Sequence, residues 1–193
     1  MAWTPGHELK YWRKNGLRKG SHIYKNYFDS FKLAEHSFDG KKVADVGCGP
    51  FGGVLIELEK ADVYPIDVLA DEYNAMKVSS VKIHKGDLSQ TLPFDDGFFD
   101  YAICTNAIDH IPDMLHGMRE LNRILASGGT LFLHVHLRSK EELNKAHVHT
   151  LDLKKAEKLA KDAGFEVLQN EKDTDWVNDE ADRYATYMIL RKA

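Results

Sequence analysis

The feature that most constrains the fold is a short apolar segment that ends in an acid and is followed by closely spaced glycines, KVADVGCGPFGG at residues 42–53. This pattern predicts a buried parallel strand that breaks into a loop and restarts as a helix. Gly47 and Gly49 free the backbone to adopt positive φ, and they let a ligand approach the main chain where a Cβ would block it. The helix that begins near Gly52 would direct its free N–H groups toward a charged part of that ligand.

The spacing Gly47-x-Gly49-x-x-Gly52, taken alone, also fits a dinucleotide-binding loop. Asp45 favours a different ligand. Its carboxylate, two residues before the first glycine, could hold an aminium group directly or through water, whereas a pyrophosphate would gain nothing from a nearby anion.

Length and composition indicate one globular domain without a membrane span. A chain of 193 residues buries roughly 70% of its unfolded surface, and no apolar run approaches the 18 or so residues that cross a membrane. The first residues contain no apolar segment, so we expect no secretory signal. Cys48 and Cys104 are too few to predict a disulfide framework. A reduced, cytoplasmic location is therefore expected.

Charge is distributed unevenly along the chain. The net charge of −4 and the pI of about 6.2 disfavour non-specific binding to nucleic acid. Residues 1–42, however, hold nine Lys and Arg against four Asp and Glu. This basic arm either attracts an anionic substrate or forms a solvated helix face, and the sequence leaves both interpretations open.

Hydrophobic spacing predicts two amphipathic helices before the first strand, at about 5–15 and 21–36. They form an N-terminal extension, residues 1–39, to a single domain of residues 40–193. For about half of the aromatic residues in this extension we favour a role as a lid over the ligand, and Phe28 and Phe31 are assigned to the core.

Strands and helices alternate through the rest of the chain. Strands are predicted at about 42–46, 61–67, 81–87, 99–106, 130–135, 165–169 and 185–191, and helices at 53–60, 70–77, 113–126 and 151–163. This alternation predicts an α/β fold with a doubly wound, mostly parallel sheet of seven strands and helices on both faces. No helical pattern separates the last two strands, so we expect them to be antiparallel neighbours at one edge.

Three predicted strands end in carboxylates, at Asp45, Asp67 and Asp87. Asp67 lies 20 residues after Gly47, which places it beside the glycine loop, where a carboxylate can accept both hydroxyls of a ribose. Asp87 could accept an amino group such as that of adenine.

With these features together, residues 40–191 resemble the class I S-adenosylmethionine-dependent methyltransferases, particularly those that act on small molecules. The stretch VADVGCGP (43–50) is similar to that family's first motif, NAIDHIP (106–112) to the segment after the fourth strand, and LASGGTL (125–131) to the turn into the fifth strand. Phe51 stands where many members have a glycine, which leaves the detailed shape of the loop open.

The resemblance implies a Rossmann-like fold with S-adenosylmethionine as cofactor. It assigns the glycine loop to the methionine part, Asp67 to the ribose, the segment 86–88 to the adenine and the segment 106–112 to the surroundings of the sulfonium. The cofactor-binding residues that it implies are Asp45, Gly47, Cys48, Gly49, Asp67, Val68, Asp87, Leu88 and Asn106. Nothing basic flanks Cys48, so we expect it to contribute only its backbone.

The histidines admit two interpretations. The pairs His134-x-His136 and His147-x-His149 have spacings seen at metal sites, but the sequence places no carboxylate or cysteine with them, and methyl transfer needs no metal. We therefore predict no metal site and favour a general base, for which the candidates are His110, His136 and His147. His136 is better placed than His134 because it lies nearer the carboxyl end of its strand.

The predicted function is methyl transfer from S-adenosylmethionine to an O or N atom of a small polar metabolite or sugar, and an anionic acceptor would suit the basic arm. Three alternatives remain at this point: a nicotinamide-dependent oxidoreductase, a methyltransferase for protein or nucleic acid, and a protein that binds the cofactor without turnover. Nucleic acid is disfavoured because TNAI at 105–108 lacks the Asn/Asp-Pro-Pro-aromatic run of amino-directed nucleic-acid enzymes. No pattern identifies the acceptor or the oligomeric state.

Overall fold

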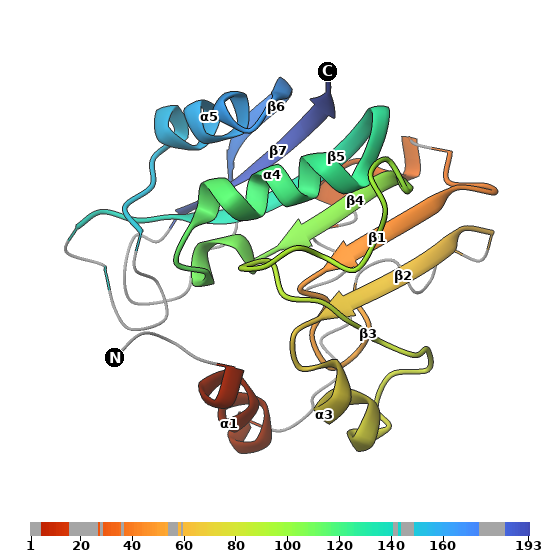
Figure 1. Ribbon diagram of the computed structural model, residues 1–193. Helices are drawn as coiled ribbons and strands as arrows, with labels where there is room; N and C mark the ends of the chain where they lie inside the picture. Colours follow the sequence, from red (N-terminus) through yellow and green to blue (C-terminus); the bar gives the residue numbers. More distant parts are fainter. Residues whose placement is uncertain are drawn as a thin grey trace.

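One seven-stranded sheet runs through the molecule, and the helices pack around it (Figure 1). The computed structural model describes residues 5–15, 27, 29–35, 37–53, 58, 60–140, 143, 149–173 and 184–193. The strands are β1 (Lys42–Val46), β2 (Asp62–Asp67), β3 (His84–Lys85), β4 (Phe99–Thr105), β5 (Leu125–Leu137), β6 (Phe165–Asp173) and β7 (Tyr184–Lys192). The helices are α1 (Pro5–Asn15), α3 (Ala70–Met76), α4 (Met114–Ile124) and α5 (Leu153–Asp162), with 3-10 turns η1 (Leu33–Glu35) and η2 (Ile108–His110).

The strand order β3-β2-β1-β4-β5-β7-β6 confirms the doubly wound sheet. β1 pairs in parallel with both β2 and β4, and the sheet grows outward from it in the two directions. β7 is antiparallel to both β5 and β6. The last two strands are thus antiparallel neighbours, as predicted, and β6 forms the edge.

Both faces of the sheet are covered. Along β4, Ala102 and Cys104 join the core beneath α4 and α5, whereas Tyr101 and Ile103 belong to the core on the opposite face. This alternation is the expected consequence of the two-residue period of a strand. The opposite core includes side chains from the N-terminal extension, namely Tyr27, Phe31, Leu33 and Phe38.

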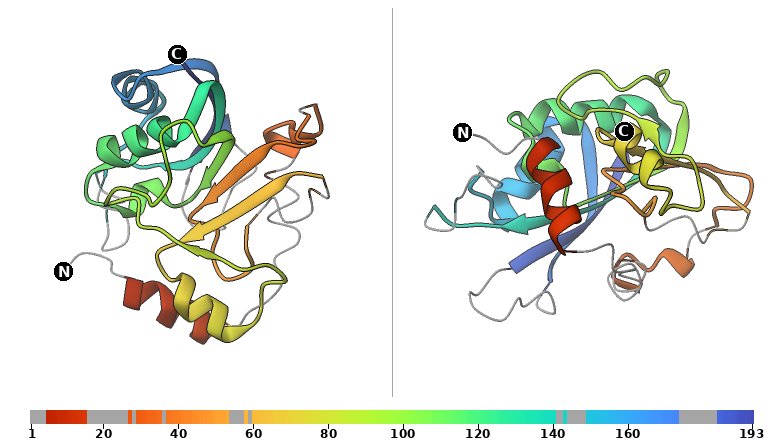
Figure 2. Two further views of the ribbon diagram at one scale, coloured as in Figure 1. Left: turned by 45° about the vertical axis from the view of Figure 1, so that its right-hand side comes forward. Right: turned by 90° about the horizontal axis from the view of Figure 1, so that it is seen from below.

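The N-terminal helix α1 has the predicted bounds and lies beside α3 (Figure 2). Leu9 and Trp12 of α1 pack against a buried cluster that includes Leu69 and Tyr73. Half of the predicted helix 21–36 lies outside the described residues, and the described residues 33–35 form the 3-10 turn η1. The predicted helix 53–60 also lies largely outside them.

The third strand is shorter than the predicted segment 81–87, since only His84 and Lys85 pair with β2. The side chain of Asn74 lies against the chain just before β3. Its amide donates to the carbonyl of Ile83 at 2.8 Å and its oxygen accepts the Ile83 N–H at 3.0 Å. These bonds satisfy both backbone groups of Ile83.

The boundary between α4 and β5 also differs from the prediction. Asp113 caps the helix as expected, but the helix ends at Ile124 rather than near residue 126, and β5 begins at Leu125 rather than at Thr130. Leu125 pairs with Phe99, and the register resumes only at Thr130 with Tyr101. The glycines at 128 and 129 therefore lie in a bulge within β5 and do not separate the two elements.

The C-terminal elements are close to their predicted positions. Asp152 caps α5, since its Oδ1 accepts the Lys155 N–H at 2.8 Å, so the helix starts two residues later than predicted. Gly164 follows the helix with a φ of +88°, which is the left-handed conformation expected after a helix end. β6 and β7 both extend beyond their predicted bounds.

Arg123 of α4 forms hydrogen bonds that hold the turn before β4, residues 92–97, against the helix. Its guanidinium donates to the carbonyls of Leu92 and Phe94 and to the carboxylates of Asp96 and Glu120. Glu120 is 7% exposed and also accepts the Leu92 N–H at 2.9 Å. Removing the guanidinium would leave a nearly buried carboxylate without its cation.

We expect Arg123→Met to lower the free energy of unfolding by about 2–3 kcal/mol, because the acceptors around the guanidinium lose a charged donor. Urea denaturation followed by circular dichroism measures the change. Arg119→Met is the matched control, since Arg119 lies exposed on the same helix. Equal losses in the two variants would contradict the prediction.

Candidate active site

The winding of the sheet reverses between β1 and β4, which is where doubly wound sheets bind their ligands, beyond the carboxyl ends of the strands. The loops that leave these two strands touch. A Cβ built on Gly47 would lie 2.3 Å from the Cβ of Ala107. The Gly47 N–H donates to the carbonyl of Ile66 in β2 at 2.8 Å. The glycine loop is thus held by both neighbouring strands.

Asp45 is 1% exposed and lies directly against the far end of the glycine loop. A Cβ on Gly53 would come within 2.1 Å of Asp45 Oδ2, and Gly53 has a φ of +90°. A glycine at position 53 therefore makes room for this carboxylate.

Asp67 joins the ends of β1 and β2. Its Oδ2 accepts the Gly49 N–H at 3.0 Å and its Oδ1 accepts the Leu69 N–H at 2.9 Å. Burial raises the pKa of this carboxyl to about 6, against the lowering effect of the two N–H donors, and the charge of Glu8 adds to the rise. Each oxygen keeps a further lone pair, so the ionised group can accept two hydroxyls.

The predicted adenine residues lie just beyond β3. Asp87 is half-buried, and its Oδ1 accepts the backbone N–H and the hydroxyl of Ser89 at 2.8 and 2.7 Å. This is the hydrogen bonding of an Asx turn, which fixes the direction of the carboxyl group. Leu88 is buried in the main core.

Two further predicted cofactor residues pack beside the glycine loop. Val68 is half-buried next to the cluster that contains Cys48 and Tyr73. Burial raises the pKa of the Cys48 thiol, to which the charges of Asp67 and Asp45 also contribute. The thiol therefore stays protonated, in agreement with a backbone role for this residue.

Asn106 follows β4 and has a φ of +52°. Its amide donates to the hydroxyl of Tyr27 at 2.5 Å, and its Oδ1 lies 2.8 Å from Nδ1 of His134. Its own N–H donates to the carbonyl of His134 at 3.1 Å. The side chain of Asn106 thereby joins β4, β5 and the N-terminal extension, while its predicted contact with the cofactor stays a prediction.

The two histidines of β5 have different surroundings. His134 is fully buried between the rings of Tyr27 and Tyr187, with centroids 5.0 and 4.7 Å away. The Nδ1 of His136 lies 3.6 Å from Oδ2 of Asp109, and these side chains are 13% and 5% exposed. The sequence analysis predicted that His136 lies near the site but did not identify Asp109. The position of Asp109 in the segment 106–112, immediately before His110, could have indicated it as a site residue.

Of the other histidines considered in the sequence, the structure describes His110 and His149. His110 is half-buried at the end of η2, and its N–H donates to the carbonyl of Ala107 at 3.1 Å. His147 lies outside the described residues. Nε2 of His149 lies 2.7 Å from the carbonyl of Ile111. Within the described ranges, no group of three or more His, Cys, Asp or Glu could hold a metal ion.

Helix α1 lies against the glycine loop. Cζ2 of Trp12 is 3.9 Å from the position that a Cβ on Gly49 would take, and its ring contacts Phe51 edge-on at 6.0 Å. The indole N–H donates to Oε1 of Glu8 at 2.7 Å, which fixes the ring. Sequence reasoning gave the aromatic residues of this extension a covering role but did not single out Glu8.

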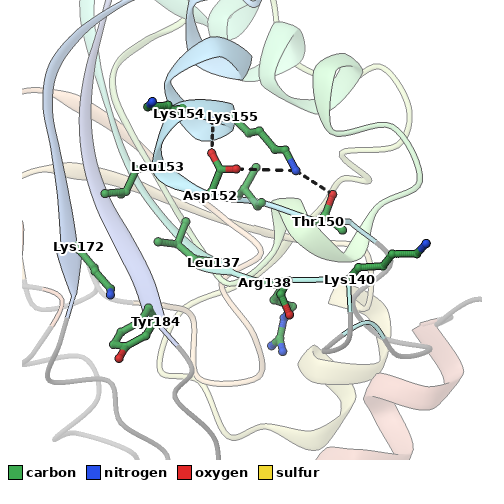
Figure 3. Close-up of a pocket in the computed structure, with 12 residues that line it drawn as sticks. Leu137, Arg138, Lys140, Thr150, Asp152, Leu153, Lys154, Lys155, Lys172 and Tyr184 are labelled. Atoms are coloured by element: carbon green, nitrogen blue, oxygen red, sulfur yellow. Dashed lines mark hydrogen bonds and ion pairs between the residues drawn. The ribbon is translucent and has the colours of Figure 1, made fainter.

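A separate cavity of about 810 Å³ lies between the end of β5, the start of α5 and the pair β6–β7 (Figure 3). Its lysines do not converge on one point. Lys155 is held by Asp152 and Thr150, and Nζ of Lys172 lies 3.1 Å from the centre of the Tyr184 ring. None of the predicted site residues that the structure describes lines this cavity.

The sheet order, the glycine loop after β1 and the buried acid at the end of β2 define a Rossmann-like domain of the kind that binds a nucleoside ligand. The chain belongs to the family of methyltransferase domains, which it matches over residues 20–170.

Two of the curated relatives of this chain are similar to it in sequence over part of its length. It is 32% identical over 148 residues to the ubiquinone biosynthesis O-methyltransferase of Psychrobacter cryohalolentis, covering 68% of this chain and 55% of that protein. It is 35% identical over 100 residues to the demethylmenaquinone methyltransferase of Staphylococcus aureus, covering 47% and 41%. The chain thus spans about half the length of the curated relatives it matches.

Among solved structures, the fold is similar to that of phosphoethanolamine N-methyltransferase 2 of Haemonchus contortus, in complex with phosphomonomethylethanolamine and S-adenosylhomocysteine. The TM-score is 0.64 at 15% identity, over 87% of this chain and 52% of that one. At 15% identity, this similarity shows that the two proteins share a fold and nothing more.

S-adenosylmethionine is the cofactor of this class, and the residues present fit it. The buried Asp45 and Asp67 supply negative charge and hydroxyl acceptors beside the loop, and Gly47 and Gly49 keep side chains out of it. In the part of the chain that the structure describes, no helix is long and apolar enough to cross a membrane.

We expect Gly53→Ala to disrupt the site, because the added methyl group would overlap the buried Asp45 carboxylate. Gly40→Ala is the matched control, since Gly40 has a similar φ of +69° with nothing within 4 Å of its added Cβ. The control should lose about 1 kcal/mol of stability through backbone strain alone. Gly53→Ala should lose at least twice as much by urea denaturation, and the same loss in both variants would refute the prediction.

Proposed function

We propose that this protein transfers the methyl group of S-adenosylmethionine to a hydroxyl oxygen of a small polar molecule. Membership of the methyltransferase family and the O-methyltransferase name of a relative support this proposal. The observation that carries it is the pair of Asp109 and His136 at the carboxyl ends of β4 and β5, because a hydroxyl acceptor has a proton to lose and a histidine can take it.

In this proposal the cofactor binds along the carboxyl edge of β1, β2 and β3. The glycine loop and Asp45 hold the methionine part, and the ionised Asp67 accepts both ribose hydroxyls. Asp87 and Leu88 bracket the adenine. The order of these residues across the sheet, β1, β2 and then β3, supports the assignment.

Helix α1 serves as a lid in the same proposal, with residues 1–39 as an extension to the domain of residues 40–193. Contacts of Trp12 with the glycine loop and of Tyr27 with Asn106 support it. Covering the site would exclude water from the reacting groups and limit hydrolysis of the donor.

His136 is the proposed general base. Bound S-adenosylmethionine supplies a methyl group that is already activated, so the chain must hold the acceptor in line and take up its proton. As the oxygen bonds to the methyl carbon and the carbon–sulfur bond breaks, the acceptor O–H proton passes to Nε2 of His136. The products are the methyl ether, neutral S-adenosylhomocysteine and a protonated imidazole that returns its proton to water.

A direct test incubates the purified protein with S-adenosylmethionine labelled in the methyl group and a panel of phenols, catechols and sugars, each in a neutral and an anionic form. Labelled methyl ether recovered by chromatography is the expected result. Methylated amines alone would move the proposal to N-methylation. Bound cofactor without any labelled product would favour a protein that binds the cofactor without turnover.

We expect the affinity for S-adenosylmethionine to fall as the pH drops below about 6. Burial raises the pKa of Asp67 to about 6, above the unfolded value of about 3.9, so the group takes up a proton in this range and loses acceptor capacity. If only the ionised form binds, the affinity decreases up to about tenfold for each pH unit below 6, and binding releases a proton there. Calorimetry between pH 5 and 8 measures both quantities.

Asp67→Asn is the control for this pH dependence. It should bind the cofactor weakly at every pH, without the decrease near pH 6. A variant that keeps the decrease would assign it to another group.

We expect His136→Asn to lower kcat by about 10²- to 10⁴-fold with little change in KM, because the acceptor proton loses its base. Steady-state kinetics at pH 7.5 measures both constants. His116→Asn on α4 is the control and should retain activity. If His110→Asn removes turnover while His136→Asn does not, the base is His110.

A further inference from the structure

We propose that Asp109 is the positioning residue for His136: it fixes the imidazole in the tautomer with the proton on Nδ1 and the lone pair on Nε2. This inference rests on the proposed function in that it gives His136 a reason to be a base. The geometry of the pair, however, stands independently of turnover. Oδ2 of Asp109 lies 3.6 Å from Nδ1 of His136, and both side chains are largely buried.

The backbone around Asp109 is held firmly. Ile108 is fully buried in the main core, and a Cβ on Gly117 of α4 would meet Ile108 Cδ1 at 2.7 Å and Ile111 Cδ1 at 2.5 Å. On the other side, the ring of His149 lies 2.7 Å from the Ile111 carbonyl. Because η2 is packed on α4 and tied to the segment after β5, Asp109 has little freedom to leave its position.

The chemistry of the two groups determines the tautomer. An ionised carboxylate only accepts hydrogen bonds, so the side of the ring that faces it is favoured as N–H. Asp109 faces Nδ1, which leaves the lone pair on Nε2. A separation of 3.6 Å is longer than a formed hydrogen bond, and such contacts often tighten only when substrate binds.

The segment 107–110, which carries Asp109, also contacts the glycine loop. Ala107 touches Gly47, and two residues later Asp109 faces His136. The 3-10 turn that carries Asp109 starts from the backbone contact of His110 N–H with Ala107 O. One rigid segment therefore sets the distance between the proposed base and the loop that would hold the methyl donor.

A purely structural role for Asp109 is the competing interpretation. A buried carboxylate is costly unless it is paired, and His136 could simply serve as its partner. The two roles predict different effects when an isosteric amide replaces the carboxylate. A structural role predicts a loss of stability, whereas a positioning role predicts a changed tautomer and a specific loss of kcat.

The first arm of the test needs no turnover. Nitrogen-15 NMR of the imidazoles in the cofactor-free protein, with the His136 signals identified by their loss in His136→Gln, shows which ring nitrogen carries the proton. We expect Nδ1–H in the native protein and a shift toward Nε2–H in Asp109→Asn. Nε2–H in the native protein, or the same tautomer in both, would overturn the proposal.

The second arm is kinetic. Asp109→Asn should lower kcat by about 10²- to 10⁴-fold with KM nearly unchanged, as expected for a misplaced proton, and Asp109→Glu should recover part of the loss. Asp113→Asn is the matched control, since Asn also caps helices well and Asp113 caps α4. A fall in kcat no larger than that of the control would overturn the positioning role.

The two arms separate this inference from the proposed function. If the native protein shows the Nδ1–H tautomer but methylates no acceptor, the methyltransferase proposal fails while the pairing stands. If the native protein methylates a hydroxyl and His136 shows Nε2–H, the function stands and the role of Asp109 is wrong.

Discussion

The contact between the Asp67 carboxylate and the Gly49 N–H is the interaction on which the site depends. It joins a loop from β1 to the end of β2, and residue 49 in this loop has a φ of +68°, which a glycine adopts without strain. Burial of the same carboxylate is costly, and two N–H donors offset only part of that cost. The site thus holds an acceptor group that further hydroxyl donors would stabilise.

The segment after β4 forms the second half of the site. Asn106 bonds to the N-terminal extension, Ala107 touches the glycine loop, and Asp109 faces β5. Three distant parts of the chain therefore meet on four consecutive residues. A change at any one of these contacts would be felt by the others, because buried groups in contact rarely contribute independently.

Local rules predicted much of this architecture. The apolar runs of β1, β2 and β4, the Asp113 cap and the glycine after α5 each depend on neighbours within a few residues. The parts that could not be predicted depend on residues far apart in the sequence. Asn74 of α3 bonds to the backbone of Ile83, nine residues further along the chain, and the bulge in β5 arises from its pairing with β4.

The candidate site shows the same division. The acids at the strand ends and the glycine loop could be read directly, because motif spacing encodes them. The pairing of Asp109 with His136 could not, since it joins residues of two different elements, and no periodicity records such a contact. His147 and most of the helix predicted at 53–60 lie outside the described residues.

The position of β7 has a consequence for how the domain is assembled. This strand comes after β6 in sequence, yet it lies between β5 and β6, and Ala185 pairs with His136 itself. During synthesis, β5 therefore keeps an open hydrogen-bonding edge until β7 has emerged from the ribosome, and such edges invite aggregation. Nascent chains that stop before β7 would be expected to bind chaperones. β5, which carries His134 and His136, would be among the last parts of the sheet to reach its native pairing.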